Sequence, residues 1–422
     1  MVAMLDTNVK RRSRQQRAIR AAAPMLARAG GEGRGLEAAV IAEARDPLLD
    51  AQLLAETSVT GALAAQQAHL QHAGACLDEL FSFSAAPNGL NELDVALTQL
   101  FTSFADLYGD PANRPLRRDI VRCAQEIAAK FNLASARLDC LRNDLNVSIQ
   151  KDVGRANQNL NGIAALNQQI LEARTSSVKA GLLAEQREQC LETLSGCVNL
   201  TSTQRADGGV NVSIGGVTMV CGSRTPDFLA TYPDQNENLR LQAQNASARL
   251  EPAGGSIAGK IRARDGALAG LRSGLNRLAA QLITRFNSIY RNGRDLHGGT
   301  GQDLFTGGDA TDIGVNSAVA GDPSRLQVGG TAETKGYDTA APALERFRQT
   351  YAQTVAHQGG TLEQISEDLS SSQAVAQMLA NERTSPHGAS IGGELTCLQS
   401  YKRACAVSAK VQATLHKMSP VQ

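Results

Sequence analysis

Tryptophan is absent from the sequence, and aromatic residues make up only 4% of its 422 residues. The sequence also has almost no excess of charge of one sign, since its 42 lysines and arginines and its 41 aspartates and glutamates give a formal net charge of +1. A nearly neutral chain has no overall field that would attract nucleic acid or an acidic membrane. Few aromatic residues favour long helices with polar faces over the compact core of an enzyme.

No run of 18 apolar residues occurs, so we expect no membrane insertion. At the start of the chain the basic residues follow the short apolar stretch, which is the reverse of their order in a secretory signal. We therefore expect any export to use a route that reads no cleaved signal. The basic run at 10–20 has no interleaved aromatic residues, which favours a solvated terminus over an arm that binds nucleic acid.

Motifs for chemistry are scarce. The eight cysteines are dispersed without a CxxC pair, which argues against a zinc or redox site. The stretch GASIG at 388–392 matches the nucleophile elbow of hydrolases, with Ser390 as nucleophile, but that elbow needs a preceding strand and a downstream acid and histidine. Only Glu394 and His416 follow, and the flanking pattern is helical. We expect no enzymatic activity.

Two further patterns resemble cation sites. The stretch GGTGQDLF at 298–305 matches one unit of the calcium-binding nonapeptide repeat, but a single copy cannot close a site between stacked turns. We interpret it as a glycine turn after a helix. His69 and His72 lie three residues apart on a predicted helix without further ligands nearby, which favours an exposed or half-buried pair. A phosphate loop, a dinucleotide fingerprint and a zincin motif are also missing, so we expect no cofactor.

Helical periodicity covers most of the chain. Apolar residues three or four apart predict helices over 47–81 and 90–108. A third helix restarts where Asn113 fits an N-cap and Pro115 the first turn, and it extends to about residue 173, with a break allowed near Phe131-Asn132. At about 1.5 Å per residue this segment would reach about 85 Å. Its coiled-coil-like seam consists of Leu138, Leu141, Leu145, Ile149, Val153, Ala156, Leu160, Ile163, Asn167 and Ile170.

Amide side chains are concentrated in the stretch RANQNLNGIAALNQQI at 155–170. Asn167 lies on the seam, where a polar residue costs stability and can fix the register of the helix. Six other amides lie off the seam, where uncharged donors and acceptors suit close packing against neighbours. Ordinary solvent exposure is the alternative for each of them. These six are Asn157, Gln158, Asn159, Asn161, Gln168 and Gln169.

A further helix over 179–194 is expected to pair antiparallel with the long one. The pattern then changes to alternation, and Val210, Val212 and Ile214 before Gly215-Gly216 predict a β-hairpin.

Short strands and loops are expected over 228–262, and helix returns over 261–291. A glycine-rich turn and a loop of about 40 residues follow. The last patterns predict helices over 342–357, 361–383 and 393–418.

Together these patterns predict a mainly α fold, an elongated helical bundle with coiled-coil-like long helices and a small β-rich insert. The terminal helices are expected to be separate from the body. We divide the chain into a basic N-terminal segment at 1–45, helical body at 46–197, a β-rich segment at 198–260, helical body at 261–389 and a C-terminal helix at 390–422.

Several blocks of the sequence resemble one protein family. They begin with Ser13-Arg14-Gln15, ARDPLLDAQLLAETS at 44–58 and LFTSFADLYGDPANRPLRRDIVRCAQEIAAKFN at 100–132. NQNLNGIAALNQQI at 157–170 and the blocks at 259–305 and 388–418 complete the series. In order and spacing these blocks are similar to the family of the first flagellar hook-associated protein, which forms the junction between hook and filament in bacterial flagella.

The resemblance implies a structural protein that is exported by the flagellar type III apparatus, with a dedicated cytoplasmic export chaperone. It also implies self-association in a ring in the extracellular flagellum, with the hook protein and a second junction protein as partners. In this family the N- and C-terminal helices pair to form an inner tube. The seam of the C-terminal assembly helix would then carry assembly through Leu398, Tyr401, Cys405, Val411, Leu415 and Met418.

The sequence departs from the family pattern at its ends. Asp6-Thr7-Asn8-Val9 passes almost directly to Arg12, so we expect a shortened N-terminal helix. Cys405 stands where the family has tyrosine. Because a helix without a partner is marginal in water, we expect the purified chain to be monomeric. The alternative function is a secreted helical protein or adhesin that has lost flagellar assembly.

Overall fold

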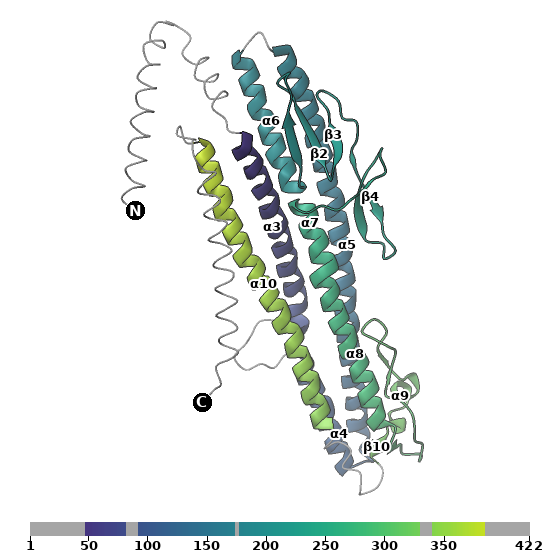
Figure 1. The fold of residues 1–422 in the computed structure, drawn as a ribbon. Helices are drawn as coiled ribbons and strands as arrows, with labels where there is room; N and C mark the ends of the chain where they lie inside the picture. Colours follow the sequence, from purple (N-terminus) through teal and green to yellow (C-terminus); the bar gives the residue numbers. More distant parts are fainter. Residues whose placement is uncertain (1–46, 82–91, 174–176, 330–339, 385–422) are drawn as a thin grey trace, which may run out of the picture.

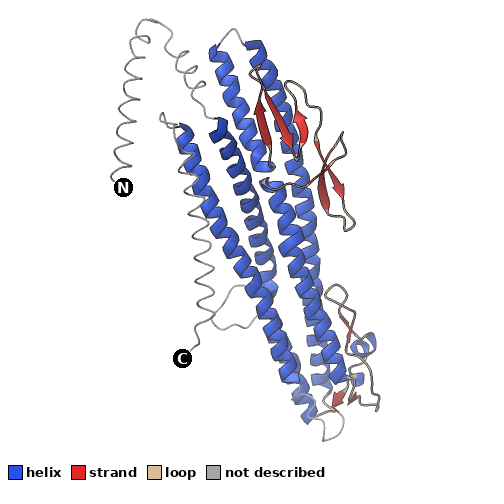
Figure 2. Cartoon of the chain, in the orientation of Figure 1, coloured by secondary structure: helices blue, strands red, loops and turns tan. Residues whose placement is uncertain are grey.

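The computed structural model describes residues 47–81, 92–173, 177–329 and 340–384. These residues form a long rod in which helices run lengthwise and β-rich segments lie along one side (Figure 1). Figure 2 shows the predominance of helix over strand. The prediction of a mainly α fold with a small β insert is confirmed. Among the described helices, none is long and apolar enough to cross a membrane.

The central element is α5, Arg114–Glu172, a single helix of 59 residues. It starts as predicted, because the Asn113 side chain accepts a hydrogen bond from the Leu116 backbone N–H at 3.1 Å and Pro115 lies in the first turn. At about 1.5 Å per residue the helix is about 88 Å long. The break allowed near residue 131 does not occur, since Phe131 is fully buried within a continuous apolar stripe.

The predicted seam of α5 is confirmed, since every one of its residues is buried. α6, Ser177–Cys197, packs along it and covers the predicted second helix. The chain reverses direction between these two helices, so they are antiparallel (Figure 1). The predicted helices before α5 are also present as α3, Pro47–Phe81, and α4, Glu92–Gly109. Four apolar residues spaced three or four apart in α4 are all buried, namely Leu93, Leu97, Leu100 and Phe104.

After α6 come two small antiparallel sheets. The first contains β1, Thr201–Gln204, β2, Val210–Ile214, and β3, Val217–Val220, in that order. Gly215 and Gly216 form the predicted turn of the hairpin, and their φ angles of 56° and 83° are ones that side-chain-bearing residues rarely adopt.

The second sheet contains β4, Leu229–Pro233, β5, Leu239–Ala243, and β6, Arg249–Leu250. Both sheets lie beside the second half of α5 (Figure 1).

The β-rich segment leaves and rejoins the helices at one point. α7, Gly255–Arg262, starts directly against the end of α6, and a Cβ on Gly255, whose φ is +79°, would lie 2.3 Å from the Cys197 carbonyl carbon. The Asn199 side-chain oxygen accepts hydrogen bonds from the backbone N–H groups of Ala253 and Gly254 at 2.9 and 3.4 Å. Residues 198–254, called the insert below, therefore interrupt two helices that follow one another along the rod (Figure 1).

Helix resumes at Gly255, so the prediction of strands and loops up to residue 262 is wrong for its last part. α7 passes into a π-helical stretch, Ala263–Leu268, and then into α8, Ala269–Tyr290. Gly254 and Gly255 allow the start of α7 to lie in close contact with α3 and α6.

The predicted loop after α8 contains short elements that pair with one another. Each strand there has only two residues, too few for an alternating pattern to be visible in the sequence. β7 pairs with β10 and β8 pairs with β9. The elements are β7, Gly293–Arg294, β8, Phe305–Thr306, β9, Gly314–Val315, α9, Ser317–Gly321, a 3-10 turn, Pro323–Arg325, and β10, Val328–Gly329.

A single helix, α10, Ala340–Thr384, replaces the two helices predicted over 342–357 and 361–383. It continues through Gly359 and Gly360, both exposed. Each glycine costs a helix interior about 0.5–1 kcal/mol relative to alanine. Packing of α10 along α3 and α8 offsets this cost.

Two large cores fill the rod. The aromatic core joins α4, the first half of α5, α8 and the segment after α8, and its ring centroids lie 5.3–6.2 Å apart. The insert core joins the second half of α5, α6 and the two sheets with aliphatic side chains. The rings of the aromatic core are Phe101, Phe104, Phe286, Tyr290 and Phe305.

Several predictions fall outside the described residues. These are the basic segment at 1–45, the turn at 87–89 and the C-terminal helix at 393–418.

Candidate functional site

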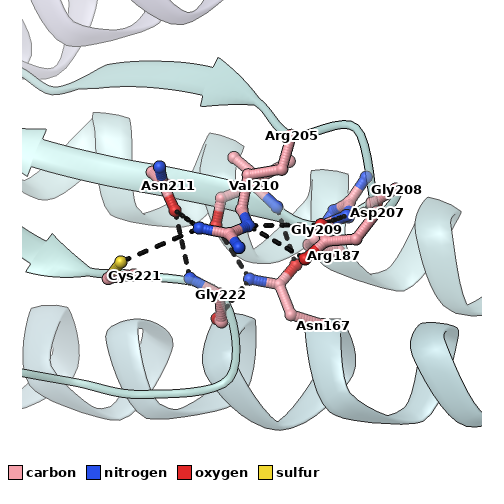
Figure 3. A network of polar contacts seen from close by, with 10 residues as sticks. All are labelled: Asn167, Arg187, Arg205, Asp207, Gly208, Gly209, Val210, Asn211, Cys221 and Gly222. Carbon is pink, nitrogen blue, oxygen red and sulfur yellow. Dashed lines mark hydrogen bonds and ion pairs between the residues drawn. The ribbon is translucent and has the colours of Figure 1, made fainter.

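A network of polar contacts lies where α5, α6 and the insert meet, around Asn167 (Figure 3). Asn167 is 4% exposed. Its side-chain nitrogen donates to the carbonyl oxygens of Val210 and Gly222 at 2.8 and 2.7 Å. Its side-chain oxygen accepts from the Val210 N–H at 3.1 Å. One buried amide therefore satisfies both backbone groups of Val210.

Arg187 of α6 completes this site, which we call the Asn167 clamp. Arg187 is 5% exposed, and its Nη1 donates to the Asn167 side-chain oxygen at 3.1 Å and to the Gly208 carbonyl at 2.8 Å. Its charge lies 3.7 Å from the Glu188 carboxylate. Hydrogen bonds to a charged donor are the stronger kind, so the clamp ties two helices and two loops of the insert together.

An outer layer of polar contacts holds the loops that the clamp grips (Figure 3). Arg205 pairs with Asp207 at 3.0 Å, and Asp207 accepts a hydrogen bond from the Gly209 N–H at 3.0 Å. Asn211 accepts from the Gly222 N–H at 3.0 Å. These side chains fix the turn between β1 and β2 and the end of β3, which are the two places that Asn167 contacts.

A second polar group links α5 to α7 inside the rod. The Lys260 ammonium lies 2.6 Å from the Asp152 carboxylate, and the two residues are 8% and 4% exposed. Ser256 also donates to that carboxylate, and Arg155 lies 3.7 Å from it. A buried pair of this kind is weak evidence for stability, but removal of one partner leaves an uncompensated charge.

Some histidines and cysteines lie close to these polar groups, since Arg205 donates to the Cys221 sulfur at 3.9 Å (Figure 3). Burial, followed by the charges of Lys260 and His72, lowers the pKa of His69, while Asp152 opposes the shift. Burial raises the pKa of the Cys123, Cys190 and Cys197 thiols, which favours the uncharged form. Within the described part of the chain, no group of three histidine, cysteine or acidic residues is placed to hold a metal ion.

The glycine-rich stretch at 298–305 forms a turn, as interpreted from the sequence. Gly298 and Gly301 both have φ of 81°. Asp295 accepts hydrogen bonds from backbone N–H groups within the turn, at 2.8 Å from His297 and 2.7 Å from Gly299. The acid of the motif, Asp303, pairs with Arg291 at 2.5 Å.

Comparison with known proteins identifies the family. The family model described as the flagellar hook-associated protein FlgK helical domain matches residues 77–305, more than half of the chain. The chain belongs to the FlgK family. The matched residues contain α4 to α8, both sheets of the insert and the Asn167 clamp.

Two curated relatives agree with membership of the FlgK family. Flagellar hook-associated protein 1 of Escherichia coli K12 is 24% identical over 311 residues, covering 71% of this chain and 55% of the relative. Flagellar hook-associated protein 1 of Bacillus subtilis 168 is 23% identical over 317 residues, covering 67% of this chain and 60% of the relative. The chain thus spans little more than half the length of these relatives.

A solved structure supports the fold. The flagellar hook junction protein FlgK of Burkholderia pseudomallei superposes with a TM-score of 0.53 at 23% identity. The match covers 61% of this chain and 46% of that protein. The long-helix architecture of this FlgK family member therefore has an experimentally solved counterpart.

The structure places the predicted site residues unevenly. Asn167 is buried on the seam as expected, although its hydrogen bonds run to strands and to α6, and its role in fixing register stays a prediction. The six assembly residues, Leu398, Tyr401, Cys405, Val411, Leu415 and Met418, lie outside the described residues, as does Ser390. Of the other amides, Asn157 packs against β4, whereas Gln158, Asn161, Gln168 and Gln169 are exposed.

Sequence reasoning missed Arg187, Asp152 and Lys260. Lys260 and Asp152 lie 108 residues apart, and an isolated charge within a helical pattern is normally solvated. A partial signal was present in Asp152, because it lies three residues after Ile149 and four before Ala156 of the seam and so lies toward the buried face.

Proposed function

We propose that this protein is a structural component of the bacterial flagellum that joins hook to filament. The observation that carries this proposal is the match of the FlgK helical domain to residues 77–305, which contain α4 to α8 and the insert. The names of the relatives, flagellar hook-associated protein 1 and flagellar hook junction protein, support the same role. The role is mechanical and requires no catalytic residue.

The proposal includes partners and a location. The hook protein would lie on one side and a second junction protein on the other, with copies of this chain in a ring between them. The protein would act outside the cell after export without a cleaved signal, escorted to the export apparatus by a chaperone. Support for these details is the family membership, which the chain shares over about half of the relatives' length.

We further propose that the C-terminal helix carries assembly through Leu398, Tyr401, Cys405, Val411, Leu415 and Met418. The support is their spacing, which is three or four residues everywhere except between Cys405 and Val411, where Ser408 continues the pattern; this spacing places them on one face of a helix. An apolar face of this kind is marginally stable in water unless another helix covers it.

Complementation tests the proposed function. The gene is expressed in a motile bacterium that lacks its own hook-associated protein 1, and swimming and filament attachment are measured. We expect filaments to be restored. Secretion of the chain without attachment to hooks would favour the alternative of a secreted helical protein or adhesin.

A matched pair of variants tests the assembly face. Replacement of Leu398 and Leu415 by aspartate should abolish attachment to hooks, because charge is placed on the apolar seam. Replacement of Gln399 and Ala413 by aspartate adds the same charge off the seam and should leave attachment intact. Equal loss in both variants would show that charge alone, and not the seam, is responsible.

A further inference from the structure

Asparagine side chains of α5 contact the insert by a repeated arrangement. In the Asn167 clamp, one amide exchanges two hydrogen bonds with Val210, the first residue of β2. Asn157 does the same with Leu229, the first residue of β4. Its nitrogen donates to the Leu229 carbonyl at 2.8 Å, and its oxygen accepts from the Leu229 N–H at 2.9 Å.

Asn146 repeats the contact at β5 in a looser form. Its oxygen accepts from the N–H of Leu239, the first residue of β5, at 3.2 Å. Its nitrogen donates to the Glu237 carbonyl at 3.3 Å. Arg264 reinforces this contact, because its Nη1 donates to the Asn146 oxygen at 2.7 Å and to the Leu239 carbonyl at 3.0 Å.

The three asparagines are spaced to act together. Asn146, Asn157 and Asn167 are separated by eleven and ten residues, which is close to three helical turns in each interval. An asparagine amide carries the same C=O and N–H groups as a peptide unit. Each side chain can therefore take the place of the missing neighbour strand where a strand of the insert begins, and satisfy backbone groups that burial would otherwise leave unpaired.

The arrangement recurs at the other end of the rod. Asn287 of α8 is 3% exposed and donates to the carbonyl of Phe305, the first residue of β8, at 2.7 Å. Its oxygen accepts from the N–H groups of Phe305 and Leu304, each at 3.1 Å. A second β-rich segment is thus attached to a different helix by the same contact.

We propose that Asn146, Asn157 and Asn167 are positioning residues that dock the insert onto α5 as one unit. The entry and exit of the insert meet at Asn199, so the rod can remain folded when the insert opens. Loss of one docking amide should then make both sheets open more often. This inference does not depend on the flagellar role.

The test is hydrogen exchange of the full chain carrying Asn157→Leu. Leucine has a similar volume without the two polar groups, so a side chain that merely fills space would be replaced without effect. We expect exchange to accelerate about 10- to 100-fold at Leu229 and Leu241 of the second sheet and at Val212 of the first. Asn159→Leu is the matched control, since Asn159 bonds only to its own helix at the Arg155 carbonyl in the contacts described, and exchange should change less than about twofold.

Two further variants keep the inference testable. Asn157→Asp keeps the acceptor and loses the donor, so it should act in the same direction if the leucine variant folds poorly. Asn287→Leu should accelerate exchange at Phe305 and leave both sheets of the insert unchanged. The proposal is overturned if Asn157→Leu leaves exchange in both sheets unaltered, or if the change is confined to the Leu229 amide.

Discussion

The two ends of the rod attach a β-rich segment in different ways. At the aromatic core, the Phe305 ring of the segment after α8 packs on Phe286, and Arg117, 1% exposed, donates to the carbonyl of Leu326 at 2.6 Å. At the insert core, the packed side chains are aliphatic, and the polar contacts are made by the Asn167 clamp and the Lys260–Asp152 pair. An asparagine that replaces a peptide unit occurs at both ends, so attachment by amides is compatible with either kind of core.

The largest effect should come from the aromatic core. Phe286 is 5% exposed and has ring contacts with Phe101, Phe104, Tyr290 and Phe305. Phe286→Ala should lower the free energy of unfolding by about 3–5 kcal/mol, measured by urea denaturation. Phe286→Leu retains most of the volume and should lose less. Equal losses would show that cavity formation is not the cause.

The buried charge pair gives the next effect, in the insert core. Lys260→Met leaves the Asp152 carboxylate without its ammonium partner and should lower the free energy of unfolding by about 3 kcal/mol. The double variant Asp152→Leu with Lys260→Met removes both charges and should recover most of that loss. A double variant that is no more stable than the single one would mean that the pair contributes net stability.

High pH should lower the free energy of unfolding by about 2–3 kcal/mol through a tyrosine of the aromatic core. Burial raises the pKa of Tyr290 from 10.0 to about 12. Because the folded pKa is the higher one, this stabilising contribution is complete below pH 10 and is lost as the pH rises from 10 to 12. The loss should be visible as a difference between the parent chain and Tyr290→Phe, compared by denaturation at pH 9 and pH 12. Parallel pH dependences of the two proteins would contradict it.

The smallest effect concerns α10, which packs along α3 and α8. Gly359→Ala should raise the free energy of unfolding by about 0.5–1 kcal/mol, because the helix is exposed there and a Cβ would meet nothing within 4 Å. Gly255→Ala is the opposite case, since its Cβ would lie 2.3 Å from Cys197 at a φ of +79°. Replacement of glycine by alanine should therefore raise the melting temperature at residue 359 and lower it at residue 255.

Patterns of residues close in the sequence predicted much of the fold but little of the candidate site. The seam of α5, the Asn113 cap and the Gly215-Gly216 turn depend on residues close in sequence, and all were predicted. The continuity of α10 was not, because packing on α3 overrides the weak preference of two glycines. Asn167 stood out as a polar residue on an apolar seam, but nothing local could indicate its partner Val210, 43 residues away.

The contact between Cys197 and Gly255 closes the insert into a loop. The helices of the rod hold its two ends together. The entropic cost of closing such a loop grows only with the logarithm of its length. Doubling the number of residues in it would cost about 0.6 kcal/mol of that entropy. This junction is therefore a point at which the chain can gain or lose residues between related proteins while the length and phase of the helices on either side stay the same.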